Sequence, residues 1–194
     1  MKATTLLENQ HREVESMFDA IERSNAANRQ QLVNELATAL AAHMVIEEEI
    51  FYPMTMSVCR EIIPENQEEH ELAASTVQRT VLCQSDEEVL MARVRVLRTL
   101  IEEHIRREET DLFPSVESAI DDAQLQAIGQ QMSGRFNQLI KLSPQAVLAA
   151  RPTAGMPCPG QRQQPSSQPG TLQQPGTLQQ PGQPKGRQGT GRTR

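Results

Sequence analysis

Apolar residues recur every three or four positions along four segments of the chain, the spacing of one face of an amphipathic α-helix. The first segment carries Leu7, Val14, Phe18 and Ile21. The second carries Leu32, Leu36, Leu40, Ile50 and Met54. The third carries Ile63, Ala74, Val77 and Val81, and the fourth carries Leu90, Val94, Leu97, Ile101 and Leu112. This pattern predicts an all-α domain with four long helices.

Residues beside these stripes refine the predicted elements. Thr4 and Thr5 precede the main part of the first stripe and are candidate N-caps. Three acidic residues follow Ser85, where they would occupy the first turn of the fourth helix and interact favourably with its dipole. A fifth, shorter helix is predicted from about Asp122 to Leu142. Its apolar side consists of Leu125, Ile128, Met132, Phe136 and Leu139.

Each of the four stripes has a gap in its apolar register, and a histidine fills every gap. These histidines are His11, His43, His70 and His104. Glu47 and Glu108 follow His43 and His104 by four residues, so each pair shares one helix face. If histidines fell at random on stripes covering ~3/7 of helix positions, all four would do so roughly 3 times in 100. The pattern therefore favours one shared site over four unrelated core histidines.

Electrostatics points to a metal at that site. Two carboxylates and four imidazoles in an apolar core are costly without a cation between them, and the same stripe positions carry no Lys or Arg. Six protein donors are too many for one tetrahedral zinc; they suit two metal ions that share the carboxylates and keep coordination positions open. Imidazole with carboxylate is compatible with iron, manganese or zinc.

The chain also contains an internal repeat. The segment HMVIEEEIFYP, from His43 to Pro53, matches HIRREETDLFP, from His104 to Pro114, in the positions of His, of two adjacent Glu and of the final Pro. A further histidine lies 32 residues before His43 and 34 residues before His104. We therefore expect two copies of one unit, a helix with His followed by a helix with His-x-x-x-Glu.

Composition divides the chain near residue 144. Residues 151–194 hold eight of the twelve Pro, eight of the ten Gly, six of the 19 Lys and Arg, and no Asp or Glu. Such a segment buries too little apolar surface to offset its ordering entropy, so we predict a domain over residues 1–143 and a disordered tail over residues 144–194. The tail is interpreted either as a docking or tethering segment, whose partner is unknown, or as a low-complexity extension.

The remaining domain is strongly acidic. Residues 1–150 hold 13 Lys and Arg against 25 Asp and Glu, a net charge of −12, which argues against nucleic acid or an anionic membrane as a partner of the domain. No apolar run approaches the ~20 residues that span a bilayer, and the start lacks the pattern of a signal peptide, so we expect a cytoplasmic protein. Cys59, Cys83 and Cys158 are expected to be reduced thiols.

These motifs resemble the hemerythrin-like, or HHE cation-binding, family of up-and-down four-helix bundles, in its bacterial branch with four His and two Glu. The resemblance covers residues 5–115 and rests on LLENQHREVESMF around His11, EEHE around His70, and the two repeated His-x-x-x-Glu segments. It implies a non-haem di-iron centre, in which Glu47 and Glu108 bridge two Fe ions and the four histidines are terminal ligands. Ferritin-like bundles, with Glu-x-x-His, have a different order and spacing.

The neighbours of the proposed ligands leave several roles open. The bacterial branch of the hemerythrin-like family commonly has Asp before the first His, where this chain has Gln10. Tyr52 is expected to point off the stripe and pack beside the site, unless Pro53 bends the chain; a phenolate ligand or a radical role is the alternative. Asp111 is either a hydrogen-bond acceptor near the site or an exposed acid. The acids beside the proposed bridges, Glu48 and Glu109, are expected to be solvated.

The favoured function is reversible binding or sensing of O2, NO or peroxide at a carboxylate-bridged metal pair. No histidine remains for general-base catalysis once the ligands are assigned, which favours binding over elaborate organic chemistry. A catalase-like enzyme that disproportionates peroxide is one alternative, because such chemistry needs the metals and little else. Iron handling or iron-centre repair, and a metal-gated interaction module acting through the tail, are the others.

Overall fold

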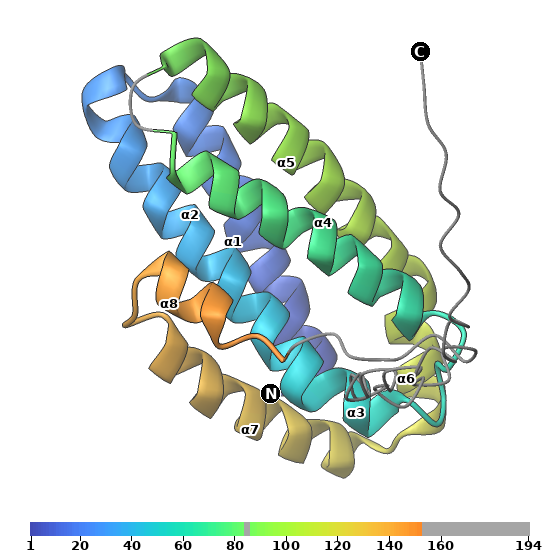
Figure 1. Cartoon of the computed structure of the whole chain (residues 1–194). Coiled ribbons are helices and arrows are strands. Elements are labelled where there is room, and N and C mark those ends of the chain that lie inside the picture. Colours follow the sequence, from blue (N-terminus) through green and yellow to red (C-terminus); the bar gives the residue numbers. More distant parts are fainter. Residues whose placement is uncertain (84–85, 153–194) are drawn as a thin grey trace, which may run out of the picture. The chain divides into compact units, whose positions relative to one another are not determined.

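The computed structural model describes residues 1–83 and 86–152, and within these ranges it contains helices and no β-strand. Four long helices form the bundle: α1 (Ala3–Arg23), α2 (Ala26–Ile46), α4 (Ile63–Val81) and α5 (Glu87–Arg107) (Figure 1). They run alternately up and down, and α1 packs on α2, α2 on α4, α4 on α5 and α5 on α1. The predicted up-and-down four-helix bundle is confirmed.

Helices α2 and α5 each continue through one turn of π-helix. η1 (Glu47–Phe51) leads into α3 (Tyr52–Thr55), and η2 (Glu108–Leu112) leads into α6 (Phe113–Ala119). The amide that follows each π-turn donates to the carbonyl five residues earlier, at Glu47 and Glu108. One residue is thereby added to the turn, which rotates the following side chains by about 100° relative to a continuous α-helix.

The first π-turn explains an error in the predicted second stripe. Met54 is 54% exposed and Ile50 is half-buried, although both were placed on the buried face. Phe51 and Thr55 are fully buried in their place. The first, third and fourth stripes are buried as predicted.

The helix starts were predicted with mixed success. The N-cap of α1 is Lys2, and Thr4 is buried in the first turn, where its hydroxyl donates to Glu117 over 2.5 Å, so the predicted threonine caps are wrong. At α5 the side chain of Asp86 accepts from the amide of Val89, and acids occupy the first turn as expected.

The predicted fifth helix is α7 (Asp122–Leu139), which packs against α1, α2 and η1. A further helix, α8 (Pro144–Ala149), lies in the range assigned to the tail and packs against α2 and α4. Because Val147 is fully buried there, the boundary predicted at residue 143 is too early. The rest of the predicted disordered tail, residues 153–194, lies outside the described residues.

The apolar core consists of two clusters. One surrounds the start of α1, the end of α2, the segments η2 and α6, and helices α7 and α8; the other fills the remainder of the four-helix bundle. On α1, Leu7 belongs to the first cluster and Val14 to the second, with His11 between them. The same order recurs on α4, where His70 separates Ile63 from Ala73. A layer of polar side chains thus divides the core.

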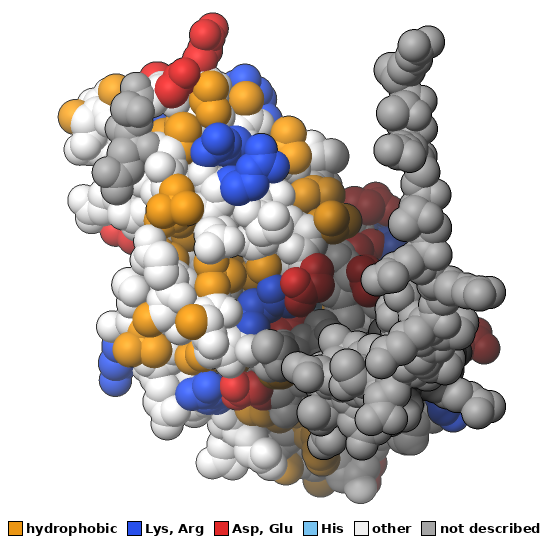
Figure 2. Space-filling model, viewed as in Figure 1, with side chains coloured by type: hydrophobic (Ala, Val, Ile, Leu, Met, Phe, Trp, Pro, Cys, Tyr) orange, Lys and Arg blue, Asp and Glu red, His pale blue; other side chains and the backbone are white. Residues whose placement is uncertain are grey.

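On the surface, acidic, basic and apolar side chains intermingle on the face drawn in Figure 2. Among the described helices, none combines the length and apolar composition needed to cross a bilayer. Cys59 is buried and Cys83 half-buried, and both are free thiols. Cys158 lies outside the described residues.

Candidate metal centre

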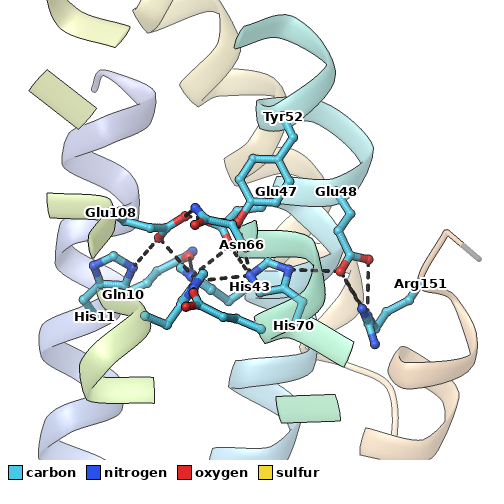
Figure 3. A network of polar contacts seen from close by, with 12 residues as sticks. Gln10, His11, His43, Glu47, Glu48, Tyr52, Asn66, His70, Glu108 and Arg151 are labelled. Atoms are coloured by element: carbon cyan, nitrogen blue, oxygen red, sulfur yellow. Dashed lines mark hydrogen bonds and ion pairs between the residues drawn. The ribbon is translucent and has the colours of Figure 1, made fainter. Parts of the chain in front are cut away.

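The polar layer brings together all six residues that the sequence analysis proposed as ligands; Figure 3 labels all of them except His104. The four histidines come one from each long helix and are at most 5% exposed. Glu47 and Glu108 are fully buried, and each is the first residue of a π-turn. Each acid therefore lies where the backbone hydrogen-bond pattern changes from α-helix to π-helix. Such π-turns are frequent at functional sites.

Each carboxylate contacts one histidine of its own helix and one from the other half of the bundle. Glu47 Oε2 lies 3.2 Å from His43 Nε2 and 3.3 Å from His70 Nε2. Glu108 Oε2 lies 3.5 Å from His104 Nε2 and 3.4 Å from His11 Nε2. The two repeats thus exchange contacts across a pseudo-two-fold axis, so the site requires both halves.

The outward-facing nitrogens of the four histidines all contact hydrogen-bond acceptors. His11 Nδ1 lies 2.9 Å from Glu109, His70 Nδ1 2.9 Å from Glu48, and His104 Nδ1 2.9 Å from Glu69. His43 Nδ1 lies 2.9 Å from the side-chain oxygen of Gln10. Because ionised carboxylates accept and cannot donate, these contacts assign the proton of a neutral ring to Nδ1 in His11, His70 and His104, and the side-chain oxygen of Gln10 does the same for His43. All four Nε2 lone pairs then point into the centre.

Two of these lone pairs face each other at short range. His70 Nε2 and His104 Nε2 are 3.1 Å apart, a distance that calls for a proton or another cation between them. Burial lowers the pKa of His104, but Glu108 and Glu69 outweigh that effect and raise the pKa above its ordinary value. A proton on His104 therefore relieves the contact, and a metal cation can take over that role.

The acids beside the proposed bridges were expected to be solvated, and this expectation is wrong. Glu48 has a side chain only 6% exposed and supports His70, while Glu109 supports His11 and also pairs with Arg12. Gln10 occupies the position where the resembled branch has Asp, and as an amide it supports His43 without a charge.

Asp111 is exposed on η2, so of its two readings the structure supports the exposed acid. Its backbone carbonyl accepts a hydrogen bond from Ser115. The residue that supports His104 is Glu69, which lies directly before His70.

Tyr52 is fully buried and packs beside the centre, as expected, but the expectation that its side chain points off the stripe is wrong. Its hydroxyl donates to Glu108 Oε1 over 3.0 Å and lies 3.2 Å from His70 Nε2. The π-turn explains this orientation, because it brings Tyr52 about 100° back toward the face of Glu47. Asn66 donates to the same Glu108 oxygen over 3.1 Å. Both donors hold one carboxylate oxygen while the other faces the histidines.

Burial and neighbouring charges separate the pKa values of the two carboxyl groups. Burial and the charge of Glu108 raise the pKa of Glu47 well above its ordinary value. Burial also raises the pKa of Glu108, but His104, His11 and His43 together outweigh it, and the net pKa lies below the ordinary value. Without a bound cation, Glu47 therefore holds a proton and Glu108 is ionised.

The donor set fits a metal pair. Buried side-chain atoms without a hydrogen-bond partner include His11 Nε2, both oxygens of Glu47, Oε2 of Glu108 and Oδ1 of Asn66. Possible ligand atoms form two groups, each within 4.8 Å. One contains His11, His43, Glu47 and Glu108; the other contains Glu47, His70 and His104. Glu47 belongs to both groups, as a bridging carboxylate would, whereas Glu108, the other predicted bridge, belongs to the first group alone.

A small cavity touches the centre. It has a volume of about 10 Å³ and is bordered by all four histidines and by Glu69. The rest of its wall is apolar, formed by Val14, Leu40, Met44, Ala73, Leu100, Ile101 and Ile105. This volume is about that of one water-sized probe, so the space suits a very small ligand.

Three contributors escaped the sequence analysis. Asn66 lies four residues before His70, on the same helix face, which is the one signal that could have identified it. Glu69 directly precedes a histidine, but its partner His104 is on another helix. Arg151, which contacts Glu48, lies in the range assigned to the tail.

Comparisons with known proteins agree with this geometry. Residues 2–116 match the family model described as the hemerythrin HHE cation binding domain. The Mycobacterium tuberculosis protein Rv2633c is 28% identical over 116 residues, which cover 59% of this chain and 71% of the relative. The Mycobacterium bovis protein Mb2666c matches with the same identity and coverage.

A solved structure shares the fold. It is the crystal structure of a hemerythrin HHE cation binding domain-containing protein from Mycobacterium kansasii, a homologue of Rv2633c. The two structures have a TM-score of 0.66 and 23% sequence identity, and the match covers 76% of this chain and 97% of the other. At 23% sequence identity, this structural similarity supports the assignment of the fold.

Proposed function

Because this chain belongs to the hemerythrin HHE cation-binding domain family, we propose that it holds a pair of iron ions and binds a small ligand, O2 or NO. The ligands are His11, His43, Glu47, His70, His104 and Glu108. When bound, the ions supply an open coordination position and redox chemistry. Iron is chosen over manganese and zinc because the hemerythrin-like family, which the sequence resembles, encloses a di-iron centre.

One observation carries the proposal: four Nε2 lone pairs and two buried carboxylates face a common centre. Among the described residues, no Lys or Arg pairs with Glu47 or Glu108. A cluster of this kind is unfavourable in a core unless a cation is bound. The carboxylates and Gln10 behind the histidines fix the ring orientations, which is how ligating histidines are usually held.

The surroundings of the centre suit a small ligand. The cavity of about 10 Å³ touches the four rings, and its small volume excludes larger molecules. Tyr52 and Asn66 hold Glu108 through Oε1 and leave Oε2 directed at the rings. These residues position the site, and none of them has to move for a diatomic to enter the cavity.

Metal content provides the first test. Protein produced with ample iron is expected to contain two iron atoms per chain by elemental analysis. His43→Ala is expected to lose at least one, whereas Glu8→Gln, at an exposed site on α1, serves as the control and should keep both. One metal or none in the wild-type protein contradicts the dinuclear site.

Ligand binding provides the second test. Reduced protein is mixed anaerobically with NO, and separately with O2, and the visible spectrum is followed. A new absorption that reverses when the gas is removed supports binding. Rapid, irreversible oxidation by O2 together with no response to NO contradicts it.

Peroxide disproportionation is a second candidate, favoured by Glu69. This carboxylate borders the same cavity and is 23% exposed, so it links the cavity to solvent. The hydrogen bond from His104 lowers its pKa, which keeps it ionised beside the cavity. Sustained O2 evolution from peroxide, lost in His104→Ala, supports this enzyme activity; no O2 evolution from the iron-loaded wild type excludes it.

A further inference from the structure

Arg151, just beyond α8, makes a two-pronged ion pair with Glu48 on η1 (Figure 3). Its Nη2 lies 2.6 Å from Oε1, and its Nε lies 3.2 Å from Oε2. The side chains are only 9% and 6% exposed. Charge-assisted, two-pronged contacts of this kind are among the strongest hydrogen bonds in proteins, and solvent screens this one little.

The same Glu48 oxygen reaches the proposed metal centre. Oε1, which accepts from Arg151, also lies 2.9 Å from His70 Nδ1. A guanidinium, a carboxylate and a ring nitrogen therefore form one continuous chain that ends at His70 Nε2, the proposed ligand atom. Because Arg151 fixes the position of Glu48, it also fixes which nitrogen of His70 carries the proton.

Two other histidines are held in a similar way by arginines of the bundle itself. Arg12 pairs with Glu109 behind His11, and Arg107 pairs with Glu69 behind His104. Their side chains are 54% and 28% exposed, much more than that of Arg151. Arg151 also lies 35 residues beyond the last residue matched by the family model. The arginine that pairs with the acid behind His70 thus comes from outside the matched segment.

We propose that Arg151 is a positioning residue for the metal centre, so that the segment containing α8 forms part of the site. The inference rests on the proposed function, because it assigns His70 as a ligand. Without Arg151, the nearly buried carboxylate of Glu48 loses its counter-charge. The carboxylate can then turn away from His70, and the ring is free to populate its other tautomer or rotate.

The chain offers a control at Glu49, the acid next to Glu48. Arg135 on α7 makes a two-pronged ion pair with Glu49, with distances of 2.8 and 2.9 Å. This pair also fastens a C-terminal helix to η1, but among the described residues Glu49 contacts no histidine. Arg151→Gln and Arg135→Gln therefore both remove such a fastening, and only the first affects His70.

The decisive measurement uses the full-length chain without metal. Ring nitrogens of ¹⁵N-histidine-labelled protein are recorded by NMR, and the His70 signals are assigned by their loss in His70→Gln. We expect the Nδ1–H tautomer of His70 in the wild type and in Arg135→Gln, and a mixture of tautomers in Arg151→Gln. Arg151→Lys, which keeps the charge but loses the fork, should restore most of the wild-type signal.

Metal affinity adds a second readout, with Co²⁺ as the probe in competition with a chelator. The loss expected for Arg151→Gln is about 10- to 100-fold, the usual range for partners of ligating histidines, against less than about twofold for Arg135→Gln. If the wild type binds no metal, the proposed function fails while the tautomer experiment still stands. An unchanged His70 tautomer in Arg151→Gln overturns the inference; should the glutamine variant fail to fold, Arg151→Met, which also removes the guanidinium, is judged by the same criterion.

Discussion

At the scale of single residues, the centre contains two buried carboxyl groups with opposite pKa shifts. Glu108 is surrounded by hydrogen-bond donors and a histidine that favour its charge, whereas Glu47 has neither oxygen paired. Glu47 therefore contributes little to the stability of the fold and is suited to a cation. Groups retained for function in this way commonly reduce stability.

Without metal, the Glu47→Gln variant is expected to be more stable than the wild type, and the difference in the free energy of unfolding should grow as pH rises. Unfolded Glu47 titrates near 4.5, and burial raises its pKa in the folded state. Above pH 4.5 the folded state keeps a proton that the unfolded state has lost, so this residue makes the wild type progressively less stable. The gain is about 1.4 kcal/mol for each pKa unit of that shift.

Melting temperatures of metal-free wild type and Glu47→Gln, measured between pH 5 and 8, check this expectation. The difference between the two proteins separates the contribution of position 47 from the pH dependence that both proteins share. Glu8→Gln is the exposed control and should show no such trend. A difference that stays constant with pH contradicts the raised pKa of Glu47.

The sequence was sufficient to identify the six proposed ligands, but not their partners. The ligands interrupt apolar stripes, so their position follows from helix periodicity. Their partners depend on which side chains meet across helices: Glu48 reaches back to His70, and Glu69 reaches over to His104. Such contacts are set by the register between helices, which the period of one helix does not contain.

At the scale of secondary structure, the two π-turns mark the limit of prediction from periodicity. An extra residue in one turn leaves no trace in the hydrophobic pattern, yet it rotates everything that follows. For this reason Met54 was placed in the core and the side chain of Tyr52 was expected to point off the stripe, and both expectations are wrong. The long helices contain no such insertion, and their buried faces were predicted correctly.

Packing of α7 depends on a close approach at Gly129. A Cβ atom there would lie 2.5 Å from the carbonyl oxygen of Met1 and 2.9 Å from the amide nitrogen of Ala3. Both neighbours are backbone atoms, so one helix must shift to accept a methyl group. We expect Gly129→Ala to lower the free energy of unfolding by about 1–3 kcal/mol.

Gly134, five residues later on the same helix, provides the opposite case. An added Cβ there meets nothing within 4 Å. Gly134→Ala should stabilise the protein by about 0.5–1 kcal/mol, because alanine loses less backbone freedom in a helix. Urea unfolding of both variants tests the pair, and a shift of the same sign in both contradicts the packing argument.

At the scale of the whole molecule, the described domain extends past the four-helix bundle. Compositional change placed the boundary at residue 143, because Pro and Gln begin to accumulate there. Val147 nevertheless fills a buried position, and Arg151 reaches Glu48. A six-residue helix has too short an apolar pattern to stand out from a polar tail, so this part of the fold could not be predicted.

Two truncations separate α8 from the segment beyond it. A chain ending at Pro152 is expected to keep the thermal stability and metal content of the full chain, as the sequence analysis predicts for a tail without fixed structure. A chain ending at Leu142 should lose stability, by about 1.5–3 kcal/mol for Val147 alone, and bind metal more weakly. Calorimetry and elemental analysis distinguish them. Equal stability of the two truncated chains contradicts a structural role for α8.

The position of Tyr52 has an optical consequence. The sequence contains one tyrosine and no tryptophan, so the ultraviolet emission of the whole chain comes almost entirely from this ring. Its hydroxyl lies within 3.2 Å of two proposed ligands, His70 and Glu108. We expect a metal ion that enters the centre to change that hydrogen bonding and to quench the excited phenol. The protein thus carries a fluorophore that reports the filling of its own site without an added label.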